Sequence, residues 1–154
     1  MTSSFLLGLL LIAQEPGAAL ERFFIGRTEG SGTVHVIMSG RHSVRDRSTG
    51  RMQGDTLVID QVVEEEGKPA RRRTMRLTRA GGNAVSGTIS DARGRVHGEV
   101  SGNTLTLRYR LTQGPSVVQT ITLQPGGRTA RNRMTFRQWG VNVGTVETTI
   151  RRVN

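Results

Sequence analysis

The chain has 154 residues, no cysteine and a formal net charge of +10. This length suggests one domain with a single core, and the lack of cysteine excludes disulfides, zinc–thiolate sites and thiol catalysis. The charge favours anionic surfaces and ligands but does not indicate a fold.

Residues 1–19 have the features of a signal peptide or apolar leader. The apolar run from Phe5 to Ala13 is too short to span a bilayer as a helix, but it matches the apolar centre of a secretory signal. We therefore expect export to the periplasm or envelope, with the folded domain over residues 20–154. No lipid anchor is expected, because a lipoprotein precursor needs a cysteine at its cleavage site. The alternative is an apolar segment that docks on the domain.

A short helix is expected directly after the leader. The segment AALERFF, Ala18 to Phe24, places Leu20, Phe23 and Phe24 at i, i+3 and i+4 spacing, which is typical of one apolar helix face.

From Thr33 onward the sequence consists of short alternating runs separated by turn residues. A spacing of roughly 8–12 residues predicts an all-β fold, and the short connections predict antiparallel hairpins. A meander of about ten strands closes most simply into an up-and-down barrel without free edges. The expected strands are Thr33–Ser39, His42–Met52, Asp55–Glu65, Ala70–Arg79, Ala84–Ser90, Arg95–Ser101, Asn103–Thr112, Ser116–Gln124, Thr129–Trp139 and Val141–Arg151.

Alternation within each run assigns the two faces of the barrel wall. In TLTLRYRL, for example, Leu105, Leu107 and Tyr109 share one face, while Arg108 and Arg110 share the other. We expect the apolar faces to point inward and the arginine and threonine faces to form the outer wall. Several polar side chains nevertheless fall on inward faces, namely Arg73, Tyr109, Gln119, Asn132 and Gln138.

The stretch QVVEEEGKPARRR, Gln61 to Arg73, places three glutamates and three arginines on either side of a turn. We interpret it as a hairpin with cross-strand charge pairs, in which Glu64 lies opposite Arg71 and Val62 opposite Arg73. A metal site is not expected, because consecutive carboxylates on a strand point to alternate faces.

Signals for catalysis or nucleic-acid binding are weak. The histidines lack metal-ligand spacing, and no G-x-S-x-G nucleophile motif occurs. The glycine-rich GRTEGSG, Gly26 to Gly32, precedes a strand rather than a helix, so it is not a phosphate-binding loop. An enzyme would need two titratable groups inside the barrel, such as Asp60, Glu147 or a histidine. Few aromatics are available to stack on bases, so no nucleic-acid partner is expected.

These patterns favour a non-enzymatic binding protein for a small apolar or anionic amphipathic, lipid-like ligand, with no cofactor. Inward polar groups beside apolar ones are typical of a ligand site inside a barrel, and Arg73 would meet an anionic head. Two alternatives remain: a filled core with polar mouths, and an envelope interaction protein that binds anionic surfaces through its arginine-rich exterior. The predicted ligand-binding residues are Arg73, Met75, Tyr109, Gln119, Met134 and Phe136.

Two segments resemble an uncharacterised family of bacterial envelope proteins, many of them lipoproteins. They are ERFFIGRTEGSGTV near the start and NRMTFRQWGVNVGTVETTIRR at the end, and the similarity extends over about residues 20–152. The resemblance implies a lipocalin-like barrel and an envelope location, without an established activity. It also implies that the signature positions plug and close the barrel; these are Phe23, Phe24, Gly26, Trp139 and Gly140.

Overall fold

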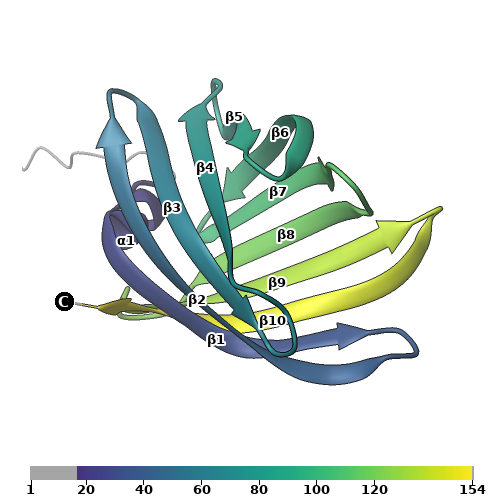
Figure 1. Cartoon of the computed structure of the whole chain (residues 1–154). Coiled ribbons are helices and arrows are strands. Elements are labelled where there is room, and N and C mark those ends of the chain that lie inside the picture. The colour runs from purple at the N-terminus through teal and green to yellow at the C-terminus, as the bar shows by residue number, and fades with distance from the viewer. Residues whose placement is uncertain (1–16, 154) are drawn as a thin grey trace, which may run out of the picture.

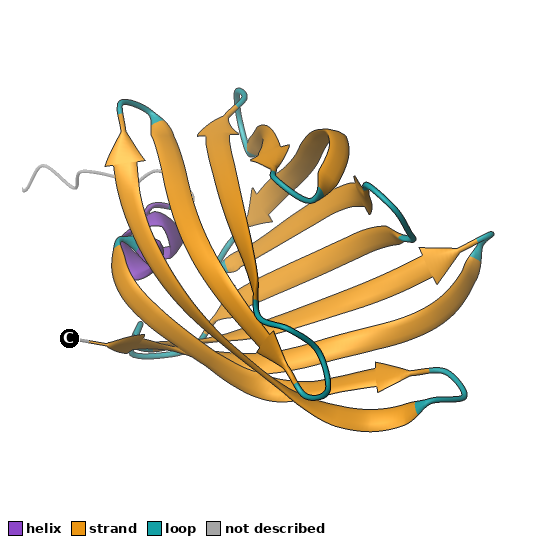
Figure 2. Ribbon diagram, in the orientation of Figure 1, coloured by secondary structure: helices purple, strands orange, loops and turns teal. Residues whose placement is uncertain are grey.

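The structure is a computed structural model that describes residues 17–153, so the expected leader lies almost wholly outside the described residues. A short helix, α1 (Ala18–Phe24), is followed by strands only (Figures 1 and 2). The strands are β1 (Gly26–Val36), β2 (Gly40–Gln53), β3 (Thr56–Glu65), β4 (Arg71–Arg79), β5 (Ala84–Ile89), β6 (Ala92–Ser101), β7 (Thr104–Leu111), β8 (Ser116–Leu123), β9 (Thr129–Gln138) and β10 (Val141–Val153).

The strands form a closed antiparallel barrel. Each strand pairs with its neighbours in the sequence, and β1 pairs with β10 to close the sheet. The predicted ten-stranded up-and-down barrel with an N-terminal helix is therefore confirmed. Within residues 17–153, no helix is long and apolar enough to cross a bilayer.

Helix α1 packs against one end of the barrel (Figure 2). Its apolar face is buried, and the rings of Phe23 and Phe24 meet edge-on with centroids 5.0 Å apart. Gly50 of β2 allows this close packing, since a Cβ there would lie 1.8 Å from the Phe24 carbonyl oxygen. The core at this end combines helix and strand residues, among them Leu20, Phe23, Phe24, Leu57, Leu77, Val85, Val96, Val100, Leu105, Leu107, Ile121, Leu123 and Ile150.

Strand β1 spans Gly26–Val36, so it begins and ends earlier than the expected first strand, Thr33–Ser39, and includes the glycine-rich segment. Gly30 and Gly32 in this segment allow close approach within the sheet rather than a turn. A Cβ at Gly30 would lie 2.3 Å from Asp46 Oδ2, and one at Gly32 would lie 1.8 Å from the Glu147 carbonyl oxygen. Glycine inside a strand often marks such a contact.

The predicted register of the β3–β4 hairpin is wrong by one residue. Val62 lies opposite Arg72, and Gln61 lies opposite Arg73. The prediction assumed a symmetric turn, but Ala70 also belongs to the connection, because β4 begins at Arg71. Glu64 consequently pairs with Arg47 of β2 at 3.3 Å rather than with Arg71.

Candidate ligand cavity

The barrel encloses a cavity of about 380 Å³ at the end opposite α1. This volume lies within the usual range for small-molecule sites, roughly 300–1,000 Å³. The cavity extends from the middle of the barrel to the hairpins at its open end. Its apolar wall consists of Val34, Val36, Val44, Val63, Leu111, Pro115, Met134, Phe136, Val143 and Val146.

Most of the predicted ligand-binding residues line interior space. Arg73, Gln119, Met134 and Phe136 line the main cavity. Met75 lines a smaller void of about 50 Å³ nearer to the helix, which Arg73 and Gln119 also border. Tyr109 is buried behind these residues and reaches them through hydrogen bonds. The inward orientation of this set is confirmed, whereas its role in ligand binding stays a prediction.

Polar side chains from neighbouring strands form a hydrogen-bonded belt across the barrel interior. Tyr109 Oη donates to Gln119 Oε1 at 2.9 Å, and Gln119 Nε2 donates to Asn132 Oδ1 at 2.8 Å. Asn132 Nδ2 then donates to Thr148 Oγ1 at 3.1 Å. The polar belt, as we use the term, consists of Asp46, Gln61, Arg73, Tyr109, Gln119, Asn132 and Thr148.

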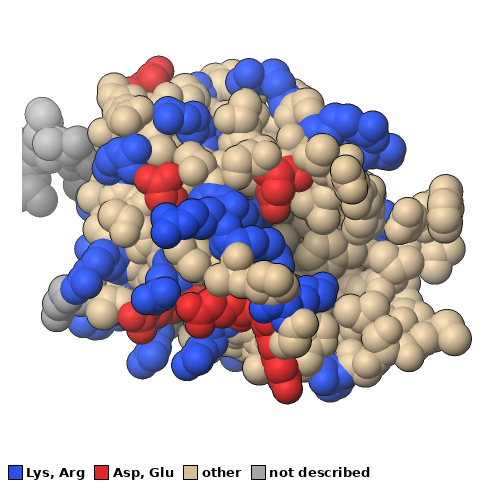
Figure 3. Space-filling view, viewed as in Figure 1, with Lys and Arg blue, Asp and Glu red and all other residues tan. Residues whose placement is uncertain are grey.

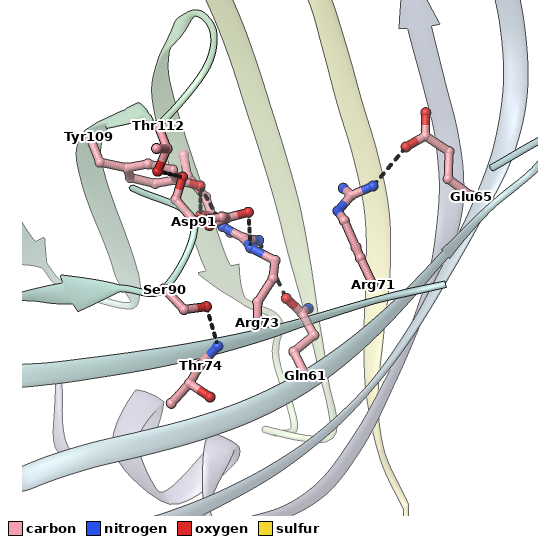
Figure 4. Close-up of polar contacts among 10 residues, drawn as sticks. Gln61, Glu65, Arg71, Arg73, Thr74, Ser90, Asp91, Tyr109 and Thr112 are labelled. Atoms are coloured by element: carbon pink, nitrogen blue, oxygen red, sulfur yellow. Dashed lines mark hydrogen bonds and ion pairs between the residues drawn. The ribbon is translucent and has the colours of Figure 1, made fainter. Parts of the chain in front are cut away.

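Arg73 connects the belt to the turn between β5 and β6 (Figure 4). Its side chain is only 8% exposed, and Nε lies 2.9 Å from Asp91 Oδ2. The guanidinium also donates to Gln61 and Tyr109 at 3.4 Å. Burial alone would lower the pKa of Arg73, but Tyr109 and Asp91 outweigh it and raise that pKa. Arg73 is therefore charged, and Asp91 already offsets its charge.

Asp46 adds a carboxyl group to the same belt, beside Gln61. Burial raises its pKa above the ordinary value, although hydrogen bonds from Gln61 and Ser48 and the charge of Arg73 act in the other direction. The floor of the cavity therefore holds one arginine and two carboxyl groups, those of Asp46 and Asp91. One oxygen of Asp91, Oδ1, is shielded from solvent and accepts no hydrogen bond from residues 17–153.

A second group of charged residues, which we call the rim cluster, lies where β2, β3 and β4 meet at the cavity mouth. It consists of His42, Glu65, Lys68 and Arg71. The buried Glu65 carboxylate lies 2.6 Å from His42 Nε2, 3.2 Å from Lys68 Nζ and 3.1 Å from Arg71 Nη1. Burial would raise the pKa of Glu65, but hydrogen bonds from His42, Arg71 and Lys68 lower it to about 2.

The depressed pKa predicts how Glu65 contributes to stability as pH changes. Because the pKa falls from 4.5 to about 2 on folding, ionised Glu65 stabilises the fold above about pH 4.5, and this contribution is lost as pH falls toward 2. Glu65→Gln is expected to lower the free energy of unfolding at neutral pH by about 1.5–3 kcal/mol, the usual value for charged hydrogen bonds. Urea unfolding from pH 7 to pH 2 measures this difference.

The exposed neighbour Glu64 provides the matched control. Its side chain and that of Arg47 are 47% and 67% exposed, so Glu64→Gln should cost no more than about 1 kcal/mol. If Glu65→Gln and wild type differ by the same amount at pH 2 and pH 7, the three hydrogen-bond partners do not stabilise the Glu65 carboxylate.

The acids considered for catalysis lie outside the barrel. Asp60 pairs with Arg51 at 2.7 Å, and Glu147 pairs with Arg133 at 2.5 Å, both on the exposed wall. Hydrogen bonds from Arg51 and Thr74 lower the pKa of Asp60. The carboxyl groups that line the cavity are instead those of Asp46, Glu65 and Asp91. No group of three or more metal-ligating side chains occurs within residues 17–153.

A separate groove of about 560 Å³ lies over strands β1 to β4. Arg27, Arg47 and Arg72 border it, together with acidic Glu29 and Asp60. Its side chains are mostly polar, in contrast to the apolar wall of the interior cavity. It therefore suits a charged partner better than an apolar ligand.

The sequence also matches a family model. The model described as "Protein of unknown function (DUF3833)" covers residues 11–152. The chain belongs to the DUF3833 family. This confirms the resemblance to an uncharacterised family, and no curated protein matches the sequence.

Two solved structures share the DUF3833 barrel fold. The S-type phycobiliprotein lyase CPES from Guillardia theta superposes with a TM-score of 0.70 at 9% identity, covering 92% of this chain and 95% of the lyase. Rv2717c from M. tuberculosis superposes with a TM-score of 0.68 at 14% identity, covering 91% of this chain and 100% of that protein. At these identities the likeness shows a common lipocalin-like fold and not a common activity.

Three acids that shape this DUF3833 cavity were missed by the sequence interpretation. Asp46 lies two residues after inward Val44, and Glu65 lies two residues after inward Val63. Strand alternation therefore places both acids on the inward face, and this could have been predicted from the sequence. Asp91 lies in a turn, where no period applies. Its backbone carbonyl accepts hydrogen bonds from Thr112, and this contact holds the turn above Arg73.

Proposed function

We propose that the protein is a non-enzymatic carrier for a small amphipathic molecule that binds inside the barrel. The observation that carries this proposal is the cavity of about 380 Å³, which combines a mainly apolar wall with polar groups at its floor and rim. Ligand sites commonly have this composition, because the apolar wall supplies affinity and the polar groups fix orientation.

The charges at the two ends of the cavity favour one orientation of the ligand. Lys68 and Arg71 at the rim exceed Glu65 in charge, whereas Asp46 and Asp91 at the floor exceed Arg73. An anionic group therefore fits the rim, and the floor fits a neutral group or a hydrogen-bond donor. Arg73 is the competing contact for an anionic head, but a ligand must share it with Asp91.

The orientation is tested by two arginine variants. Arg71→Met should weaken binding of an anionic amphipathic probe, anilinonaphthalene sulfonate, about tenfold, as expected for loss of one charged hydrogen bond. Arg108→Met is the control, because Arg108 lies on the outer wall and pairs with Glu99. If Arg73→Met weakens probe binding and Arg71→Met does not, the anionic group lies at the floor.

Binding itself is tested by filling the cavity. Val44 and Val63 are inward and buried, so Val44→Phe/Val63→Phe should weaken binding of the same probe at least about tenfold by excluding it. Val62→Phe/Val118→Phe adds the same groups to the outer faces of β3 and β8 and should leave binding unchanged. Equal affinity for both double variants would contradict an interior site. Native mass spectrometry of protein from its own source then identifies the cargo by its mass.

We also propose that the carrier works outside the cytoplasm, in the periplasm or envelope. The support is the apolar run from Phe5 to Ala13, which matches a secretory signal. Intact mass analysis of the protein from a periplasmic fraction tests this location. Full-length protein confined to the cytoplasmic fraction would contradict it.

A second candidate function is adhesion to anionic lipid or polysaccharide through the outer wall. The groove bordered by Arg27, Arg47 and Arg72 favours it, and Figure 3 shows Lys and Arg gathered over the middle of this face. Such binding should vanish at high salt. It should persist in the Val44→Phe/Val63→Phe variant, which separates it from the carrier function.

A further inference from the structure

Two hairpin tips expose large apolar side chains at the open end of the barrel. The β1–β2 tip presents Ile37 and Met38, which are 48% and 101% exposed. The β9–β10 tip presents Trp139 and Val141, which are 93% and 60% exposed. We call these four residues the apolar tips. The exposure of Trp139 also corrects the expectation that this position plugs the barrel.

The apolar tips lie side by side at the cavity mouth. Ile37 N donates to the Val143 carbonyl at 3.1 Å, and Val36 lies opposite Gly144. Val36, Val143 and Gly144 line the cavity. Both hairpins reach the right-hand end of the barrel in Figure 1, away from α1, and the right-hand end of the molecule in Figure 3 is mainly uncharged.

Local structure does not explain these side chains. Met38 and Trp139 have left-handed backbone conformations, with φ of 70° and 50°. Tight hairpin turns normally place Asn, Asp or Gly at such positions, because a large side chain there is strained. Here the strained residues point into solvent and gain no packing within the molecule, so an external contact is the explanation that the geometry favours.

The charges beside the tips indicate what covers them. The segments 36–41 and 137–143 contain no acidic residue. Arg41 and Arg137, both exposed, flank the tips on the outer face of their hairpins. Tryptophan favours the boundary between lipid and water, and arginine beside it can bury its stem while its head contacts lipid phosphates.

We propose that the cavity end of the barrel docks on an anionic lipid bilayer through the apolar tips and their flanking arginines. Docking turns the cavity mouth toward the membrane. If the barrel carries an amphipathic cargo, as proposed above, the cargo enters from the bilayer without crossing water. The docking step itself does not depend on that cargo.

Trp139 is the only tryptophan in the chain, so its fluorescence reports directly on one tip. Full-length protein is mixed with vesicles of phosphatidylcholine alone or with added phosphatidylglycerol. We expect a shift of emission to shorter wavelength with the anionic vesicles, and quenching when the phosphatidylcholine carries brominated chains. Co-sedimentation with the same vesicles gives the partition coefficient.

The tip and control variants use matched residues. Ile37→Ser/Met38→Ser should lower the partition coefficient about tenfold or more, because two apolar side chains no longer enter the lipid. Met52→Ser should leave it unchanged, because Met52 is a methionine at the other end of β2, away from the tips, and its side chain is only 37% exposed. Val44→Phe/Val63→Phe should also bind vesicles normally, so that failure of the carrier function and failure of docking remain distinguishable.

Three outcomes would overturn the proposal. Co-sedimentation without a change in Trp139 emission would assign membrane binding to the arginine wall instead. An emission shift that depends on protein concentration without vesicles would assign the tips to self-association. Unchanged partition of Ile37→Ser/Met38→Ser would show that the tips do not enter the bilayer.

Discussion

Phe23→Ala is expected to lower the free energy of unfolding by about 3–5 kcal/mol, the usual cost of removing a buried aromatic ring. Phe23 is 2% exposed and belongs to the core cluster that closes one end of the barrel. Its ring also packs edge-on against Phe24, an arrangement that adds stability beyond burial. The variant leaves a void where helix and barrel meet.

The size of this effect follows from how α1 is held. A helix of seven residues is too short to be stable alone, so its stability comes from packing and from groups that satisfy its ends. Arg152 of β10 donates to the carbonyls of Arg22 and Phe23 at the C-terminal end of the helix. Arg79 of β4 holds Glu21 at 3.3 Å. Loss of the Phe23 ring loosens these contacts together.

Urea unfolding of both proteins at neutral pH measures the change. Ile25→Ala is the control, because Ile25 directly follows the helix but is 38% exposed, and it should cost less than about 1 kcal/mol. Equal effects of the two variants would mean that the helix is not part of the barrel core.

The strands could be predicted because their signals are local. The run Asn103–Thr112 corresponds to β7 at Thr104–Leu111, and its inward residues Leu105, Leu107 and Tyr109 are all buried. Alternation fixes the two faces of a strand, and turn residues fix its ends. Both are properties of a few consecutive residues, so neither requires knowledge of the rest of the barrel.

The features that the sequence did not predict depend on residues that are distant from one another along the chain. Gly32 is required by the Glu147 backbone on β10, so its strand position is not visible in the glycine-rich segment itself. The β3–β4 register depends on a turn whose length alternation does not fix. Tryptophan is a large aromatic residue of a type that is often buried, yet Trp139 occupies the tip of a hairpin with a left-handed backbone.

The candidate site was predicted in part for the same reason. Inward polar residues such as Gln119 and Asn132 could be found one strand at a time, but their connection depends on the stagger of the barrel. Gln119 lies opposite Leu107 and Met134, and it reaches Tyr109 and Asn132 diagonally. Alternation identifies the members of the polar belt but not the order in which they bond.

Gln119→Leu is expected to lower the free energy of unfolding by about 2–4 kcal/mol. The side chain is 6% exposed and joins two partners, since it accepts from Tyr109 and donates to Asn132. Leucine has a similar size but leaves the Tyr109 hydroxyl without its acceptor and the Asn132 carbonyl without its donor. Each unsatisfied buried group costs about 1–3 kcal/mol. Thr120→Val, on the opposite face of the same strand, should change stability by no more than about 0.5 kcal/mol.

A double-mutant cycle with Tyr109→Phe distinguishes a connected belt from independent contacts. Tyr109→Phe removes the hydroxyl that Gln119→Leu leaves unsatisfied, so the double variant should be more stable than the sum of the single effects by about 1 kcal/mol or more. Burial raises the pKa of Tyr109 despite the charge of Arg73, so the phenol is a proton donor at neutral pH and the cycle measures one defined hydrogen bond. Strict additivity would mean that water replaces each lost partner. The floor of the cavity would then be hydrated rather than closed by the belt.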